Sequence, residues 1–320
     1  MKLSVIIPTY RRPEVLARCL DALERQTAPS DAFEVVVVRD AGDPSAAAVS
    51  AAVAAEHRRV QVRLLHSSSR GASAARNLGW REARAPLILF LGDDILASPH
   101  LVQEHLDWHE RRGGPDVGVL GLVRWSSEIR VTALMCWLER GIQFDYPAIS
   151  GDQASWFHFY TSNVSLPRAL MQEIGGFDEE RFPFNYEDID VGYRLEKRGF
   201  RLLYNPRALG EHLHCTDLDQ WRYRMSTTAT AERRWIRRYP EHPAYFHDKL
   251  AEAAALAPAR GRGRFLLRWI GPDFPFLGTR VWASADIYYR QQLASAFLDV
   301  WNREEAHQAE APANPARPRR

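Results

Sequence analysis

Four short apolar runs separated by helical patterns dominate the first 91 residues of this 320-residue chain. The runs are rich in Val, Ile and Leu, and the run at 34–38 is nearly continuous, which is typical of a strand covered on both faces of a sheet. The runs lie at residues 2–8, 34–38, 60–65 and 86–91, and the helical patterns at 13–23, 46–59 and 70–83. Strands that alternate with helices predict parallel βαβ units and an α/β fold.

The pattern becomes weaker after about residue 115. Further strands are expected at 117–123, 163–166 and 200–204, and a helix at 187–198. The chain then becomes helical and basic, and its end is rich in Ala and Pro. We therefore expect an α/β domain over residues 1–215 with halves at about 1–99 and 100–215, a helical extension over 216–303, and a disordered tail over 304–320.

Composition excludes several classes of protein. The net charge of +2 does not favour nucleic-acid binding by the whole chain. The longest apolar run, 86–91, is far shorter than the roughly 20 residues of a membrane span, and Pro8 with Arg11 and Arg12 interrupts the N-terminal apolar stretch, unlike a signal peptide. Three scattered cysteines without a CxxC pair fit a reducing compartment. These features predict a cytoplasmic protein.

Acidic residues follow two of the expected strands. Asp93 and Asp94 come directly after the fourth strand, and Asp40 follows the second. Ligands of open α/β sheets bind beyond the carboxyl ends of the strands, and adjacent carboxylates suit Mg²⁺ or Mn²⁺ together with phosphate oxygens. Ordinary turn chemistry explains either motif equally well when it is taken alone.

Three further motifs are candidates for chemistry. Residues 70–79 combine small residues with Arg76, which suits a helix start close to an anionic ligand. Glu187 and Asp188 open an acidic helix start, where a carboxylate could act as a general base or merely cap the helix. His212 and His214 flank Leu213 after the last strand, and a structural role is the alternative for each.

The order of these motifs gives a specific resemblance. Six motifs follow one another in a fixed order along the chain. They are residues 5–10, Asp40, 71–79, Asp93-Asp94, 175–179, and Glu187-Asp188 followed by Gly192, Arg194 and Gly199. Over residues 1–215 the chain resembles the family 2 glycosyltransferases, which have the GT-A fold, a Rossmann-like, mostly parallel mixed sheet flanked by helices. The resemblance implies an inverting transfer of a sugar from a UDP-, dTDP- or GDP-sugar to the hydroxyl of a glycan or lipid-linked acceptor.

The resemblance also implies roles for particular residues on the donor side. Asp40 matches the aspartate that holds the base, and Asp93 and Asp94 match the last two positions of the Asp-x-Asp motif. Gly92 stands at the first position and departs from the common pattern. Asp94 and His212, or His214 in its place, would hold Mg²⁺ or Mn²⁺. The expected donor-binding residues are Pro8, Thr9, Tyr10, Arg12, Asp40, Arg76 and Asp93.

On the other side of the reaction, Asp188 matches the catalytic base of the family. The residues expected on the acceptor and sugar side are Trp156, Asn163, Gly176, Phe177, Asp178 and Glu187. A nucleotidylyltransferase also uses aspartates and Mg²⁺, but it normally has a Gly-rich basic loop after the first strand, where this chain has residues 8–12. A nucleotide-sugar binding module without catalysis is the other alternative, and only Gly92 favours it.

The basic segment 222–268 has two interpretations. It holds 11 Lys and Arg against 4 Asp and Glu, a net charge of +7. A solvated helical face is the simpler one. In the other, residues 233–238 interleave arginine with Trp235 and attach the chain peripherally to anionic lipid at the inner face of a membrane.

Overall fold

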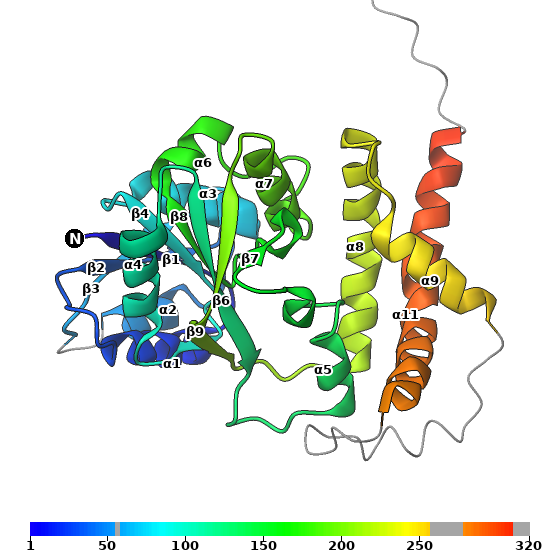
Figure 1. Ribbon diagram of the computed structural model, residues 1–320, viewed down its shortest axis with the longest axis horizontal. Coiled ribbons are helices and arrows are strands. Elements are labelled where there is room, and N and C mark those ends of the chain that lie inside the picture. Colours follow the sequence, from blue (N-terminus) through cyan, green and yellow to red (C-terminus); the bar gives the residue numbers. More distant parts are fainter. Residues whose placement is uncertain (55–57, 257–277, 310–320) are drawn as a thin grey trace, which may run out of the picture. The chain divides into compact units, whose positions relative to one another are not determined.

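The computed structural model describes residues 1–54, 58–256 and 278–309. The chain divides into two compact units, Met1–Cys215 and Thr216 onward (Figure 1). The first unit contains the sheet with its flanking helices, and the second is helical. None of the helices in the described ranges has the length and apolar character needed to cross a bilayer.

Four parallel strands form one half of the sheet in the first unit. These strands are β1 (Leu3–Thr9), β2 (Phe33–Arg39), β3 (Gln61–His66) and β4 (Leu87–Leu91). They lie in the order β3-β2-β1-β4. The side chains of β2 from Phe33 to Val38 are all buried, as expected for a strand covered on both faces. The four carboxyl ends therefore meet at one edge of the sheet.

The other half of the sheet is mixed. It contains β5 (Ile95–Ala97), β6 (Val117–Trp125), β7 (Gln153–Ala154), β8 (Asn163–Pro167) and β9 (Arg201–His212). The order continues β4-β8-β6-β9-β5, with β7 beside β9. Since β8 is antiparallel to both β4 and β6, and β6 is parallel to β9, the strands β6 and β9 end at the same edge as β1, β2 and β4.

Helices flank the sheet on both faces (Figure 1). They are α1 (Pro13–Glu24), α2 (Ala46–Val53), α3 (Ala72–Glu82), α4 (Leu101–Arg112), α6 (Arg168–Ile174) and α7 (Glu187–Glu196). The short helix α5 (Ala133–Leu138) follows β6 in the chain and lies away from the faces of the sheet. Short 3₁₀ turns lie at Tyr146–Ala148 and Trp156–His158. α1 shows the helical spacing clearly, because Leu16, Cys19, Leu20 and Leu23 are all buried against the sheet.

All the strands expected from the sequence are present, but several bounds differ. The helix expected at 46–59 ends at Val53, and the strand expected at 200–204 extends to His212. Pairing between β6 and β9 shifts between Gly121 and Leu122, which leaves residues 206–208 of β9 as a bulge. Pro206 and Arg207 at this bulge interrupt the apolar pattern, and so the sequence predicts an end where the strand continues.

A buried polar network fixes α4 against β8. Ser165 Oγ lies 2.8 Å from His105 Nδ1 and 2.8 Å from His109 Nε2, and His105 Nε2 lies 2.9 Å from Asn163 Oδ1. The Asn163 amide nitrogen donates to the carbonyl of Ala208 at 2.8 Å. Burial lowers the pKa of His105 to about 3 and that of His109 to about 4, so both rings are neutral at pH 7.

The second unit contains α8 (Leu218–Arg238), α9 (Tyr245–Ala255) and α11 (Gly278–Ala309). The carboxylate of Glu232, in α8, is fully buried and accepts from the amides of Phe246 and His247, so it caps the start of α9. Because α11 continues to Ala309, the disordered tail expected from residue 304 is wrong for residues 304–309, and 310–320 lie outside the described residues.

Candidate active site

Asp93 and Asp94 form the turn that follows β4 at the carboxyl edge of the sheet. Asp93 is 1% exposed and Asp94 8%. The hydroxyl of Thr9, the last residue of β1, donates to Asp93 Oδ2 at 2.7 Å. Arg12 places one terminal nitrogen 2.6 Å from Asp93 Oδ1 and the other 2.6 Å from Asp94 Oδ2. Three expected donor-side residues and the expected metal ligand Asp94 therefore lie in direct contact.

The two carboxyl groups differ in their affinity for a proton. Burial, together with the neighbouring charge of Asp94, raises the pKa of Asp93 to about 7, although Arg12 and Thr9 act in the opposite direction. Burial would also raise the pKa of Asp94, but the charges and hydrogen bonds of His212 and Arg12 outweigh it and hold that pKa well below its usual range. Asp94 is therefore the carboxylate that stays ionised.

His212 completes this corner from the end of β9. Its Nε2 atom lies 3.2 Å from Asp94 Oδ2, and its ring stacks on Trp125 with centroids 5.0 Å apart. The backbone amide of Leu213 donates to the Asp94 carbonyl at 2.8 Å, which fixes the two segments to each other. His214 stacks on the outer side of the His212 ring, with centroids 5.6 Å apart. Of the two histidines, it is thus His212 that contacts the Asp94 carboxylate.

The residues at this corner can be tested for their fit to Mg²⁺ or Mn²⁺. Two ligands of one octahedral ion, each about 2.1 Å from it, lie about 3 Å apart, close to the 3.2 Å between Asp94 Oδ2 and His212 Nε2. No group of three or more His, Cys, Asp or Glu side chains able to hold a metal occurs among the described residues. The protein therefore fits two donors, and the remaining ligands would come from phosphate oxygens and water.

Gly92 is held close to the Asp94 side chain. A Cβ atom at position 92 would lie 2.8 Å from Asp94 Oδ1 and 3.0 Å from Ile95 Cγ1. The Cys19 thiol of α1 reaches the Gly92 carbonyl at 3.6 Å, so α1 supports the turn from inside the core. The glycine in place of the common aspartate is thus part of how this turn packs.

Asp40 belongs to the same edge. Its backbone amide donates to the Thr9 carbonyl at 3.0 Å, and its carboxylate accepts from the amide of Gly71 at 2.7 Å. Gly71 has φ +112°, and a Cβ there would lie 2.9 Å from the Pro183 carbonyl. The start of α3 lies between Asp40 and the loop before α7, and this leaves no room for a side chain at position 71.

Arg76 connects α3 to the start of α7. One of its terminal nitrogens donates to Glu187 Oε1 at 3.0 Å, and the guanidinium lies 5.7 Å from the centroid of the Phe177 ring. Glu187 and Phe177 were expected on the acceptor side and Arg76 on the donor side. The structure brings all three together, next to the expected base Asp188, whose Oδ1 accepts from the amide of Ile189 at 2.9 Å.

The loop before α7 is tightly anchored. Asn77 binds the backbone of Phe177 in both directions, and the Ser73 hydroxyl donates to the Phe182 carbonyl. Asn185 and Tyr186 then both have positive φ, +57° and +62°, a conformation that L residues rarely adopt. Such strain concentrates where a site needs a fixed geometry. Asn77 was not among the expected site residues, although it lies in the 71–79 motif.

Several other expected residues make contacts of their own outside this set. Tyr10 is 43% exposed and its ring is 4.9 Å from the Arg11 guanidinium, while Pro8 is half-buried within β1. Asp178 pairs with Arg181 at 2.8 Å. Gly176 is buried against α3. The expectation that Asn163 faces an acceptor is wrong: it is fully buried, and its amide is used by the His105 network.

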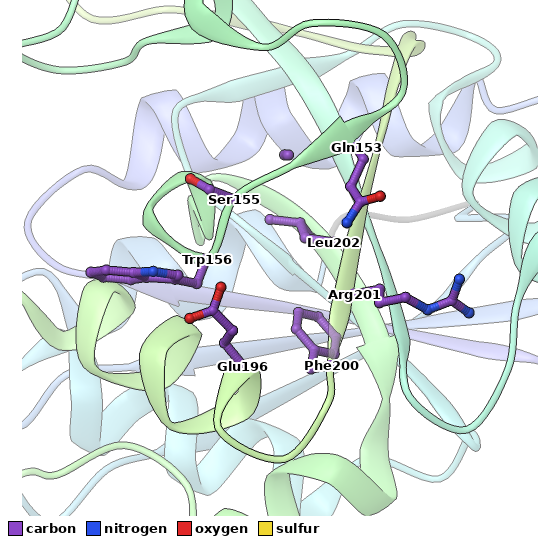
Figure 2. Close-up of a pocket in the computed structure, with 8 residues that line it drawn as sticks. Gln153, Ser155, Trp156, Glu196, Phe200, Arg201 and Leu202 are labelled. Atoms are coloured by element: carbon purple, nitrogen blue, oxygen red, sulfur yellow. The ribbon is translucent and has the colours of Figure 1, made fainter.

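Trp156 lines a separate pocket of about 390 Å³ near the start of β9 (Figure 2). Glu196, at the end of α7, points its carboxylate toward the Trp156 ring, while Arg201 extends away from it. Along β9 this pocket lies roughly 30 Å from His212, given the rise per residue of a strand. Trp156 is nevertheless connected to α7, because its carbonyl packs on Gly192 and its ring on Tyr193.

Comparison with known proteins identifies the family of this chain. A family model described as Glycosyltransferase like family 2 matches residues 2–238. The chain belongs to glycosyltransferase family 2. This family 2 chain is 31% identical over 240 residues to validoxylamine A glucosyltransferase of Streptomyces hygroscopicus subsp. limoneus, covering 65% of the chain and 51% of that protein. It therefore spans about half the length of the curated relatives it matches.

Solved structures of low sequence identity confirm the GT-A fold. A mannosyltransferase from Pyrobaculum calidifontis, in complex with GDP-Man and Mn²⁺, has a TM-score of 0.56 at 18% identity, covering 98% of this chain and 76% of its own. Residues 1–349 of TarS from S. aureus, in complex with UDP, have a TM-score of 0.54 at 15% identity, covering 98% and 93%. The α/β, mostly parallel mixed sheet expected for family 2 is thus correct.

Proposed function

We propose that this family 2 chain transfers a sugar with inversion from a nucleoside-diphosphate sugar to an acceptor hydroxyl, in the synthesis of a glycan, polysaccharide or glycolipid. The observation that carries the proposal is one continuous set of contacts at the carboxyl edge of the sheet. It runs from Asp94 through Arg12, Asp93 and Thr9 to Asp40, and from Asp40 through Gly71 into α3, whose Arg76 binds Glu187.

In this proposal Asp188 is the base. The acceptor oxygen attacks the anomeric carbon from the side opposite the diphosphate, the carbon–oxygen bond to the diphosphate breaks, and Asp188 receives the acceptor's proton. Inversion results from this single displacement. Arg76 contacts Glu187, the neighbour of Asp188 at the start of α7. Its positive charge would stabilise the negative charge that develops on the diphosphate. Asp40 and Thr9 would orient the nucleotide.

A divalent cation is the proposed cofactor. Mg²⁺ or Mn²⁺ would neutralise the leaving diphosphate, and Asp94 and His212 would hold it. Asp94→Asn should remove the Mn²⁺ dependence of nucleoside-diphosphate binding in calorimetry, whereas Asp107→Asn, an acidic residue of α4 outside this corner, should keep it. Unchanged metal-dependent binding in Asp94→Asn would place the metal elsewhere.

We also propose that the Trp156 pocket receives part of the acceptor. Aromatic faces stack on sugar rings, and carboxylate and amide groups such as Glu196 and Gln153 bind hydroxyls. The rise of an α-helix puts Glu196 about 12 Å from Asp188, a distance that two or three sugar units would span. Trp156→Ala should raise the KM for a long acceptor more than that for a monosaccharide acceptor.

Contact with an anionic membrane surface remains a proposal, with a changed set of residues. Arg233 is buried over the Trp301 ring at 4.9 Å, and Trp235 is 3% exposed, so neither is available as an anchor. Arg234, Arg237 and Arg238 are exposed on α8. Binding of the protein to vesicles with anionic lipid, lost when these three become glutamine, would support the contact.

The deciding experiment is a panel of UDP-, dTDP- and GDP-sugars with Mn²⁺, scored for release of nucleoside diphosphate and for transfer to glycan acceptors. Release or transfer from one donor supports the proposal. Pyrophosphate formed from a nucleoside triphosphate and a sugar phosphate would indicate a nucleotidylyltransferase instead. Binding of a nucleotide sugar without turnover under all conditions would indicate a binding module.

A further inference from the structure

Arg12 bridges the two carboxylates at the turn after β4, Asp93 and Asp94. It reaches two different carboxylates at 2.6 Å each, and the oxygen that it contacts on Asp94 is Oδ2, the same atom that faces His212. A planar guanidinium with its two terminal nitrogens on two carboxylates makes a strong, directional contact. Arg12 is therefore the group that joins Asp93 to Asp94 by direct contacts.

The backbone of Arg12 is held at a helix start, whereas its side chain is partly exposed. Pro13 begins α1, and the Arg12 carbonyl accepts from the amide of Leu16 at 2.9 Å, so the residue is held at the helix start. Its side chain is 39% exposed, compared with 1% for Asp93 and 12% for Asp94. The guanidinium therefore lies between the buried carboxylates and solvent, on the side from which a ligand arrives.

A divalent ion held by Asp94 and His212, as proposed above, would compete with Arg12 for Asp94 Oδ2, the oxygen that both side chains contact. It would supply positive charge at that oxygen and so weaken the contact of Arg12 with Asp94. A guanidinium released beside a metal-bound diphosphate meets phosphate oxygens, which its planar fork matches well. The two ligands then help each other, because each makes the displacement of Arg12 from the carboxylates less costly.

We propose that Arg12 exchanges partners: it bridges Asp93 and Asp94 when the site is empty and moves to the donor diphosphate when the metal binds, thereby coupling metal binding to nucleotide binding. This inference rests on the proposed function and adds a specific role to one residue. It predicts opposite effects of Arg12 on the two ligands, since Arg12 opposes the metal alone and supports the diphosphate.

Calorimetric titration of the full chain tests this without turnover. Mn²⁺ is titrated alone and then with saturating UDP, GDP or dTDP, whichever binds. Arg12→Gln should bind Mn²⁺ alone about tenfold more tightly than the wild type, and the factor by which nucleotide improves Mn²⁺ affinity should fall at least ~5-fold, within the usual range of such coupling. Arg12→Lys, which keeps the charge but cannot bridge, should fall between the two.

Arg11→Gln is the matched control, because it removes one positive charge from the residue next to Arg12. The Arg11 side chain lies over the Tyr10 ring. This control should change the affinity for Mn²⁺ alone, and the factor by which nucleotide improves it, less than twofold. That result separates bridging from a general charge effect. Unchanged or weaker Mn²⁺ binding in a folded Arg12→Gln or Arg12→Lys overturns the exchange. Failure of the wild type to bind any of the three nucleotides overturns the proposed function itself, and the exchange with it.

Discussion

The side chain of Asn77 and the backbone of Phe177 exchange two hydrogen bonds, each 2.9 Å long, in the way that two paired strands do. Asn77 also accepts from the indole nitrogen of Trp80 at 2.8 Å and donates to Glu179 at 2.6 Å. One amide thus joins α3, in the nucleotide half, to the loop that leads to α7.

Replacing this amide should be costly. Asn77→Ala leaves the buried amide and carbonyl of Phe177 without partners, and we expect the free energy of unfolding to fall by about 2 kcal/mol or more. Urea denaturation followed by circular dichroism measures this. A change within about 0.5 kcal/mol, as is usual for surface substitutions, would show that the loop does not depend on Asn77.

The proposed base gives a second prediction. Asp188→Asn keeps the shape of the side chain but cannot accept a proton, so turnover should fall by ~10² or more while donor affinity stays nearly constant. Glu180→Gln, an exposed carboxylate of the preceding loop, is the control and should turn over normally. Kinetics with the best donor of the panel would remove Asp188 from this role if both variants behave alike.

Gly92 is expected to be sensitive to even one added carbon. The new Cβ in Gly92→Ala would crowd Asp94 Oδ1 and Ile95 Cγ1, so we expect a loss of about 1–3 kcal/mol in stability and weaker Mn²⁺ binding. Gly114→Ala places its Cβ 3.1 Å from the side chain of Asp116 near the surface and should be mild. Thermal unfolding with and without Mn²⁺ compares the two, and equal behaviour would contradict the crowding.

The buried histidines predict a dependence of stability on pH. His105 has a folded pKa of about 3 against an ordinary value of 6.5, so below pH 6.5 the unfolded chain binds a proton that the folded chain does not. Stability from His105 is complete above that pH and falls by about 2 kcal/mol by pH 5.

The effect of His105 has to be measured by comparing the pH dependence of stability in the wild type and in a variant that lacks this histidine. Asp93 has a raised pKa, so it affects the pH dependence of the unfolding free energy with the opposite sign. As the pH falls, Asp93 takes up a proton in the folded chain before it does so in the unfolded chain. The change in unfolding free energy from pH 7.5 to 5 should be more unfavourable in the wild type than in His105→Gln, in which Asp93 is unchanged. The same change in both would show that His105 is protonated in the folded state.

The sequence predicted the first half of the fold well, because strands such as 34–38 are continuous apolar runs and the helices between them have clear spacing. It failed where local pattern and pairing disagree. β5 has only three residues and is defined by its pairing with β9, a strand far away in the sequence. Ile95 pairs with His212, for example, 117 positions later. α4 carries polar His105 and His109 on its inner side, where an apolar stripe would be expected.

For the site, residue types at strand ends located Asp40, Asp93 and Asp94, because such ends meet at one edge of the sheet. Contacts between side chains were not predictable. Nothing local marks Arg12 as the bridge between two carboxylates, and Asn163 stands next to the motifs but points into the core. The amide of Asn77 acquires its meaning only once Phe177, far away in the sequence, lies beside it.

β5 has a consequence for how such a protein can diversify. The segment after Asp94 leaves β4 and pairs with β9, while Leu213 and His212 at the end of β9 bind Asp94 directly. A substitution that shifts β9 to suit a new acceptor therefore also moves the carboxylate proposed for the donor's metal. The proposed donor corner and the proposed acceptor pocket thus share one strand, and grafting one half of the sheet from a relative should require its partner strand to be exchanged as well.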